Sequence, residues 1–168
     1  ISKTIFEMNK AGCAAVHIED QVFDKRCGHR PNKKIVSIDE MKERLKTAVS
    51  SKIDDSFFIM ARTDALASEG ITGAIKRCEA YIEEGIDGIF LEAVTSIEEY
   101  EVFKKNLSIP VLANITEFGK TPLFNQNQLK EVGVDMILYP LTAFRAMSAS
   151  AEKIYNSIIK DGTQEPLL

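Results

Sequence analysis

The residue with the most reactive side chain in this sequence is Cys27, which lies in the polar stretch DKRCGHRP (24–31). Three lysine or arginine residues lie within three positions of it, and nearby cations favour a thiolate over a thiol. As a nucleophile Cys27 would need a base, which only His29 offers in this stretch. A proton donor is the other chemical role, and a basic surface loop without chemistry is the simplest alternative.

Further polar residues follow five short apolar runs, which are predicted to be buried strands. The runs are CAAVHI (13–18), FFIMA (57–61), DGIFL (87–91), PVLANI (110–115) and DMILYP (135–140). Each run is continuous rather than alternating, which is typical of strands covered on both faces. The polar residues at their carboxyl ends are Glu19 and Asp20, Arg62 and Asp64, Glu92, Asn114 and Thr116, and Tyr139. In a parallel barrel these ends converge on one site, although strands that merely stop where polarity begins would give the same pattern.

The types of these side chains predict a site for a substrate with several carboxylates. Arg62 suits bidentate carboxylate binding, or else an ion pair with a neighbouring acidic residue. A second guanidinium, that of Arg145, follows the last run, and Asn114 and Thr116 offer neutral hydrogen bonds. The acidic residues at the strand ends suit a hard cation such as Mg²⁺.

Segments with helical periodicity separate the runs, so the predicted fold class is α/β. Their start and stop signals are capping boxes at Ser37 with Glu40, Thr95 with Glu98 and, more weakly, Asn125 with Gln128, and closing glycines at Gly12, Gly85 and Gly133. A last helix is expected near residues 142–160.

Repeated strand–helix units predict either an open doubly wound sheet or part of a (β/α)8 TIM-type barrel. The nine glycines fit neither nucleotide-binding pattern that an open sheet would show after its first strand. A full barrel has eight strands and typically about 250 residues. The five units are therefore either an open sheet or the C-terminal part of a barrel whose earlier strands precede residue 1. An inserted polar loop at about residues 20–36 carries Cys27.

The composition argues against two classes of partner. The net charge of −4 without a long basic run disfavours nucleic acid. No apolar run approaches the roughly 20 residues of a membrane span, and no signal-peptide pattern begins the chain. Three cysteines without metal-type spacing indicate reduced thiols and a cytoplasmic protein. Cys13 and Cys78 are interpreted as small core or helix residues, and His17 as a barrel-interior residue.

The segment KRCGH, from Lys25 to His29, resembles the K-[KR]-C-G-H signature of the isocitrate lyase and phosphoenolpyruvate mutase superfamily. Together with NITEFG (114–119), the following TP (121–122) and ARTDA (61–65), it makes the chain similar to the 2-methylisocitrate lyases of that superfamily. The resemblance runs over essentially the whole sequence. It implies one partial (β/α)8 TIM-type barrel domain, residues 1–168, with about five consecutive strand–helix units from the C-terminal part of the barrel.

This resemblance implies a Mg²⁺-dependent cleavage of 2-methylisocitrate to pyruvate and succinate in the methylcitrate cycle of propionate catabolism. Cys27 would be the general acid that protonates the departing succinate, the 20–36 loop would be a lid, and Lys25 and His29 would tune or orient the thiol. With Arg62, these are the implied catalytic residues. The implied substrate contacts are Cys27, Gly28, Arg62, Glu92, Asn114, Ile115, Thr116 and Arg145, with Phe90 and Leu138 leaving room for the substrate's methyl group.

The resemblance also implies features that this sequence lacks. Glu19 matches a carboxylate that holds a metal-bound water, but the pair of aspartates that binds Mg²⁺ directly has no counterpart here. If the chain were the whole protein, we would expect poor Mg²⁺ binding and little activity. The family's last helix is exchanged between neighbouring barrels, which implies a homotetramer, and the chain is expected to stop before that helix.

Two alternatives to this function follow. The chain would be a catalytically inactive fragment that serves as a binding or association module, or it would be a lyase that acts on isocitrate or an oxaloacetate-like acid.

Overall fold

Five parallel strands, each hydrogen-bonded to the next in sequence order, form the sheet that carries the polar strand ends. The computed structural model describes residues 1–167. The strands are β1 (Ala15–Glu19), β2 (Phe58–Thr63), β3 (Gly88–Leu91), β4 (Val111–Asn114) and β5 (Met136–Leu138). Each overlaps one of the five apolar runs, so these strand predictions are confirmed.

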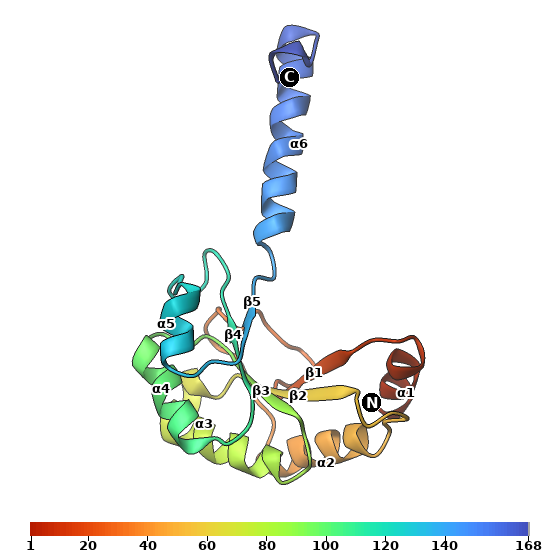
Figure 1. Ribbon diagram of the computed structural model, residues 1–168, viewed down its shortest axis with the longest axis vertical. Helices are drawn as coiled ribbons and strands as arrows, with labels where there is room; N and C mark the ends of the chain where they lie inside the picture. The colour runs from red at the N-terminus through yellow and green to blue at the C-terminus, as the bar shows by residue number, and fades with distance from the viewer. Residues whose placement is uncertain (168) are drawn as a thin grey trace.

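Helices alternate with the strands, and the first five of them lie along one side of the curved sheet (Figure 1). They are α1 (Ser2–Lys10), α2 (Ile38–Val49), α3 (Leu66–Ile82), α4 (Ile97–Asn106), α5 (Gln126–Glu131) and α6 (Thr142–Asp161), followed by a short 3-10 helix, η1 (Glu165–Leu167). The predicted α/β class and partial (β/α)8-barrel architecture are confirmed: the chain forms an arc of five parallel units whose concave side is open.

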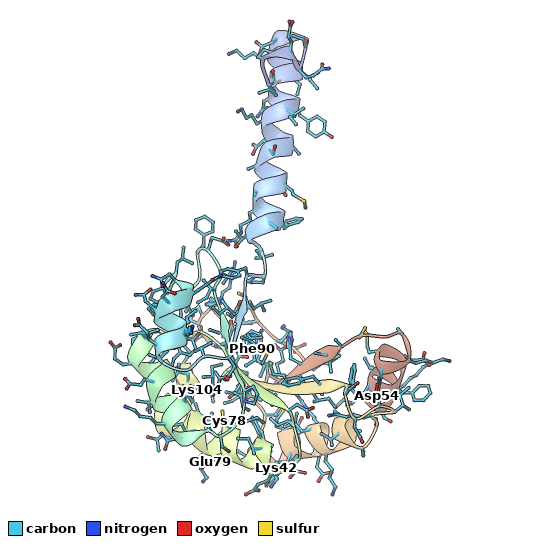
Figure 2. All side chains as sticks on the ribbon, in the orientation of Figure 1. Lys42, Asp54, Cys78, Glu79, Phe90 and Lys104 are labelled. Atoms are coloured by element: carbon cyan, nitrogen blue, oxygen red, sulfur yellow. The ribbon has the colours of Figure 1, made fainter. Side chains whose placement is uncertain are left out.

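Successive side chains of each strand point to opposite faces of the sheet, toward the helices on one face and toward the concave side on the other. Ile59, Ile89 and Val111 face the helices and are fully buried there, together with Tyr81 of α3 and Phe103 of α4. Burying a large apolar side chain in this way stabilises the fold by about 1.5–3 kcal/mol. The intervening residues of each strand face the concave side, and Figure 2 shows Phe90 of β3 there, opposite the side where Cys78 of α3 lies.

Most of the predicted helix signals are confirmed, with one shift of register. Asn125 and Gln128 form a reciprocal capping box at α5, and Ser37 accepts a hydrogen bond from the Glu40 backbone N–H at α2. The box expected at residues 95 and 98 is instead formed by Ser96 and Glu99. The Glu99 carboxylate reaches the N–H groups of both residues before the helix, which the Glu98 side chain, one position earlier, does not.

The two cysteines outside the lid differ from each other. Cys78 is buried in α3, as predicted, and burial raises the pKa of its thiol. Cys13 is exposed in the turn before β1, so the interpretation of Cys13 as a core or helix residue is wrong. Gly12 immediately precedes it with φ +83°, and this left-handed turn between α1 and β1 keeps the segment outside the core.

Helix α6 extends away from the sheet and from all the other helices (Figure 1). None of its residues is buried, and it exposes several large apolar side chains: Phe144, Met147, Ile154, Tyr155, Ile158 and Ile159. Helix α6 therefore does not pack on the sheet of its own chain, and the expectation that the chain stops before an exchanged helix stays a prediction. Among the described residues, no helix combines the length and the apolar character needed to cross a bilayer.

Candidate active site

The loop of residues 20–36, which is predicted to be a lid and is called the lid below, is held at its base by strand-like pairing. The Val36 N–H donates to the Asp20 carbonyl (2.8 Å) and the Val22 N–H to the Lys34 carbonyl (3.1 Å). Arg77 of α3 adds a hydrogen bond from Nη1 to the Val36 carbonyl (2.9 Å). The two ends of the lid are therefore fixed to each other and to α3, while its tip lies over the strand ends.

A buried carboxylate connects this base to strand β2. Asp20 is fully buried and accepts hydrogen bonds from the Thr63 hydroxyl (2.7 Å), the Tyr81 hydroxyl (3.0 Å) and the Asp64 backbone N–H (2.9 Å). Burial raises the pKa of Asp20, and the three donors oppose this rise. Because every partner lies on β2, just after it, or on α3, Asp20 aligns the start of the lid with the end of β2.

Arg62 lies at the centre of three carboxylates supplied by three different strand ends. Its Nε is 3.0 Å from Asp64 Oδ2 and 3.5 Å from Glu19 Oε2, and its Nη1 is 3.7 Å from Glu92 Oε2. Below it, the ring of Phe90 lies 5.1 Å from the guanidinium carbon. The sequence left open whether Arg62 binds a substrate or pairs with acidic neighbours, and the structure shows the pairing.

Each of these carboxylates also contacts one basic residue of the lid. Lys25 Nζ is 3.0 Å from Glu19, His29 Nε2 is 3.3 Å from Glu92, and Lys33 Nζ is 2.9 Å from Asp64. The three lid residues are spaced four apart in the sequence. With the lid in this position, four basic groups surround three acidic ones, so an anion can enter without meeting uncompensated negative charge.

His29 also ties the lid to the loop that follows β4. Its Nδ1 accepts a hydrogen bond from the Lys120 backbone N–H (3.0 Å), and an added Cβ at Gly119 would lie 2.9 Å from the imidazole ring. Because Nδ1 is the acceptor, the proton of a neutral imidazole is on Nε2, the nitrogen that faces Glu92.

A cavity of about 330 Å³ lies between the lid and the strand ends. Its lining residues are Lys25, Cys27, Gly28, His29, Arg62, Glu92, Asn114, Thr116, Glu117, Phe118, Gly119, Pro140, Leu141 and Arg145. Among the described residues, the buried Asn114 Oδ1 at this cavity has no hydrogen-bond partner, and His29 Nε2 lies 3.3 Å from Glu92 without the alignment of a hydrogen bond. Buried polar groups normally have partners, so Asn114 Oδ1 indicates a place for a polar ligand.

The structure thus brings most of the predicted site residues to one cavity, but not all. Phe90 is buried below Arg62, and Leu138 lies on β5, paired in register with Asn114. Ile115 is 3% exposed and packs in the core between the sheet and the helices, so its side chain points away from the cavity. Tyr139 is exposed and does not line the cavity.

Sequence reasoning missed the partner of Arg145. The Nη1 of Arg145 donates to the carboxylate and to the carbonyl of Glu117 (2.8 Å each), and the Thr142 hydroxyl donates to the same carboxylate. The guanidinium also lies 4.9 Å from the centre of the Phe118 ring. Glu117 and Phe118 belong to the NITEFG stretch, and the signal that could have found them was a charged and an aromatic residue directly after a strand end.

The described residues do not by themselves fit a directly coordinated Mg²⁺. No three histidine, cysteine or acidic side chains among residues 1–167 are grouped so that they could hold a metal ion. Glu19 has Lys25 near one carboxylate oxygen and Arg62 near the other. It therefore suits a water-mediated position better than a direct ligand.

Replacing Gly28 with alanine should prevent the lid from reaching this position. An added Cβ would overlap the Glu92 carboxylate, and Glu92 is buried and surrounded by Arg62, His29 and Asn114, so it has nowhere to move. In an active protein containing this chain we expect kcat/KM to fall about 100-fold, since small displacements of catalytic groups cost that much. The melting temperature should stay nearly unchanged, because Gly28 belongs to a loop; unchanged kcat/KM would contradict the closed lid.

Comparison with known proteins shows the family to which this chain belongs. A family model described as phosphoenolpyruvate phosphomutase matches residues 1–159. The chain is 56% identical over 174 residues to 2-methylisocitrate lyase from Vibrio cholerae and 52% identical over 168 residues to that of Escherichia coli. These matches cover 100% of this chain but 56% and 57% of the two relatives, so the chain spans little more than half of their length.

Solved structures show the same fold. The crystal structure of 2,3-dimethylmalate lyase is 33% identical with a TM-score of 0.92, covering 97% of this chain and 55% of that one. Oxaloacetate acetylhydrolase, solved with 3,3-difluorooxalacetate, is 32% identical with a TM-score of 0.92, covering 96% and 56%. Phosphonopyruvate hydrolase, solved with oxalate and Mg²⁺, is 23% identical with a TM-score of 0.81, covering 96% and 56%, a likeness of fold alone. The match over residues 1–159 and the identity to the two lyases show that the chain belongs to the phosphoenolpyruvate phosphomutase family.

Proposed function

We propose that the complete protein, meaning this chain with any flanking sequence of its gene, cleaves 2-methylisocitrate to pyruvate and succinate. The observation that carries the proposal is the cavity in which an accessible thiol, two guanidiniums and an amide with an unpartnered oxygen face one another. This set of groups suits a substrate with three carboxylates and a carbon that must be protonated. The identity to 2-methylisocitrate lyases supports the same reaction.

In the proposed reaction, Cys27 supplies the proton that completes the cleavage. When the carbon–carbon bond breaks, the substrate's hydroxyl gives its proton to a base and becomes the carbonyl of pyruvate. The electron pair of the broken bond remains on the carbon that becomes part of succinate, and that carbon needs a proton. Cys27 lines the cavity and is exposed, so its thiol is free to approach that carbon from the lid side. Lys25 and His29 hold the lid on either side of the thiol through Glu19 and Glu92.

Arg62, Asn114 and Arg145 are proposed to hold the substrate's carboxylates, with Gly28, Glu92, Thr116 and the main chain of Ile115 shaping the same wall. Arg62 and Arg145 approach the cavity from β2 and α6 and are partly exposed, so each retains donors for an anion. A closed lid excludes water from the reacting carbon, which prevents solvent from competing with these contacts.

The complete protein is proposed to require Mg²⁺, as the similarity of the chain to the 2-methylisocitrate lyases implies, and the ion would act as a Lewis acid on the pyruvate half of the substrate. Of this chain's residues only Glu19 is assigned to the metal, through a water molecule, and no step above depends on the ion. We also propose that the complete protein is a cytoplasmic homotetramer of the methylcitrate cycle, in which α6 packs against a second copy of the chain.

The substrate assignment is tested by comparing two acids. With Mg²⁺ present, kcat/KM for 2-methylisocitrate should exceed that for isocitrate by at least about 10-fold, the usual effect of one methyl group in an apolar pocket. Chromatography of pyruvate, glyoxylate and succinate measures both reactions, and a sample with EDTA should lose both. Equal values of kcat/KM would contradict the prediction that Phe90 and Leu138 leave room for the substrate's methyl group.

A second candidate function is association alone, favoured by the exposed apolar residues of α6. In that case the protein would assemble without cleaving 2-methylisocitrate, isocitrate or oxaloacetate. The same chromatographic assay separates the two candidates, because any product from 2-methylisocitrate excludes an inactive module.

A further inference from the structure

We infer that Lys33 is a positioning residue: through Asp64, it orients the guanidinium of Arg62 when the lid is closed. The inference rests on the proposed function, since that function assigns Arg62 to the substrate. Lys33 and Asp64 do not line the cavity. An effect of either residue on turnover must therefore pass through a residue that does.

The Lys33–Asp64 pair is shielded from water on both sides. The side chain of Lys33 is 5% exposed and that of Asp64 is 0% exposed. Lys33 Nζ donates to Asp64 Oδ1 (2.9 Å), and Arg62 donates from Nη2 to the same oxygen (3.3 Å) and from Nε to Oδ2 (3.0 Å). One carboxylate thus holds both cations, and its plane sets the direction of the Arg62 fork.

The backbone beneath this carboxylate is fixed without Lys33. The Asp64 N–H donates to Asp20 Oδ1 (2.9 Å), and Asp20 is itself held by Thr63 and Tyr81. Asp64 therefore has a rigid main chain and a side chain whose rotation is limited by its two cationic partners. Of these, only Lys33 belongs to the lid.

Lys33 occupies the point where the paired base of the lid ends. The next residue, Lys34, accepts a hydrogen bond from Val22 and closes that base, whereas Lys33 begins the part that crosses the strand ends. In our proposal the lid opens about this base, and Lys33, the first residue beyond it, leaves Asp64 when the lid opens. The pair would then exist only in the lid position that the structure shows, which links that position to the orientation of Arg62.

The charge of Asp64 supports this link. Burial raises the pKa of Asp64, but the hydrogen bonds and charges of Arg62 and Lys33 outweigh burial, so the pKa lies below its usual range. Asp64 is therefore a carboxylate in the closed state. Without Lys33 it would have Arg62 as its one cationic partner, and it would compete more strongly with the substrate for that guanidinium.

The test compares Lys33→Met with Lys34→Met in the complete protein. Both substitutions remove one lysine from adjacent positions of the lid, but Lys34 is exposed and has no ion-pair partner among the described residues. We expect Lys33→Met to lower kcat/KM for 2-methylisocitrate about 100-fold and Lys34→Met to change it less than about twofold. Lys33→Arg should recover most of the loss. Values are normalised to folded protein, measured by the thermal unfolding amplitude, so a purely structural role would leave kcat/KM unchanged.

A double-mutant cycle decides whether Asp64 carries the effect. Asp64→Asn keeps the shape and removes the charge, and we expect Lys33→Met to cost less than about threefold in that background because the coupled partner is already lost. A full loss of about 100-fold when Lys33→Met is added to Asp64→Asn would overturn the inference. Equal kcat/KM for Lys33→Met and Lys34→Met would overturn it as well.

The rate of limited trypsin cleavage after Arg26 measures how readily the lid opens in the absence of substrate. Arg26 is exposed at the lid tip, and we expect it to be cut several-fold faster in Lys33→Met than in Lys34→Met. Equal cutting rates would overturn the link between the pair and the lid. A wild-type protein inactive on 2-methylisocitrate would overturn the proposed function, while the two cutting rates would still decide whether Lys33 holds the lid.

Discussion

Replacing Cys27 with serine in the complete protein should reduce cleavage of 2-methylisocitrate by about 1,000-fold. A positioned general acid typically contributes about 10²–10⁴-fold, and a serine hydroxyl is a far weaker acid than a thiol. Cys27 is exposed. We therefore expect the free energy of unfolding to change by less than about 0.5 kcal/mol. Steady-state kinetics with chromatographic detection of pyruvate measures the first effect, and thermal unfolding the second.

Cys13→Ser is the matched control for this experiment. Cys13 is also exposed, but it lies before β1 and its thiol contacts only the sulfur of Met8. Its loss should leave kcat and KM unchanged. If Cys27→Ser retained near-normal turnover, Cys27 would have no part in proton transfer and would be at most a lid residue.

The second large effect is expected at Arg62. Arg62→Met would leave Glu19, Asp64 and Glu92 facing one another without their shared cation, and breaking a buried ion pair in this way costs about 3–5 kcal/mol. We expect a large fall in stability together with loss of activity. Denaturant unfolding measures the stability, and kinetics on the remaining folded protein measures activity.

Arg62→Lys separates charge from geometry at the same position. An ammonium keeps the positive charge but cannot reproduce the planar fork with which two guanidinium nitrogens of Arg62 donate to the two carboxylate oxygens of Asp64. Stability should recover in part, while kcat/KM should remain at least about 100-fold below the wild type. Lys105→Met is the control for a lost surface cation: Lys105 pairs with Glu101 in α4, and it should cost at most about 1 kcal/mol with no change in kcat/KM. Full activity of Arg62→Lys would show that charge alone is sufficient.

The elements of the fold were largely predictable because each depends on local pattern. The five apolar runs gave the strands, and glycines 12, 85 and 133, with φ of 82–83°, close α1, α3 and α5 as expected. The direction of α6 was not predictable. Its apolar residues would suit a helix packed on its own sheet equally well, and the sequence of one chain does not say which sheet the helix covers.

The site was predictable at the strand ends and less so between them. Alternation along β2 and β3 places Arg62 and Glu92 on the concave side, which the sequence pattern already indicates. The pairing of Lys33 with Asp64 joins residues 31 positions apart, and that of His29 with Lys120 joins residues 91 apart. Such contacts depend on the path of the lid, an irregular loop whose course no local propensity fixes.

The five strands are neighbours in the sheet in the same order as in the sequence, and this has a consequence for folding during translation. Every strand pairs with the one made just before it, so each β–α unit finds its partner as soon as it leaves the ribosome. We expect the chain to acquire structure progressively from its amino end, with little waiting for distant segments. The ion pairs of Arg62 with Glu19 and Asp64 would then form when β2 is complete, whereas Arg145 reaches Glu117 only after the start of α6 has emerged. The cavity would therefore be completed late in translation, after all five strands have emerged.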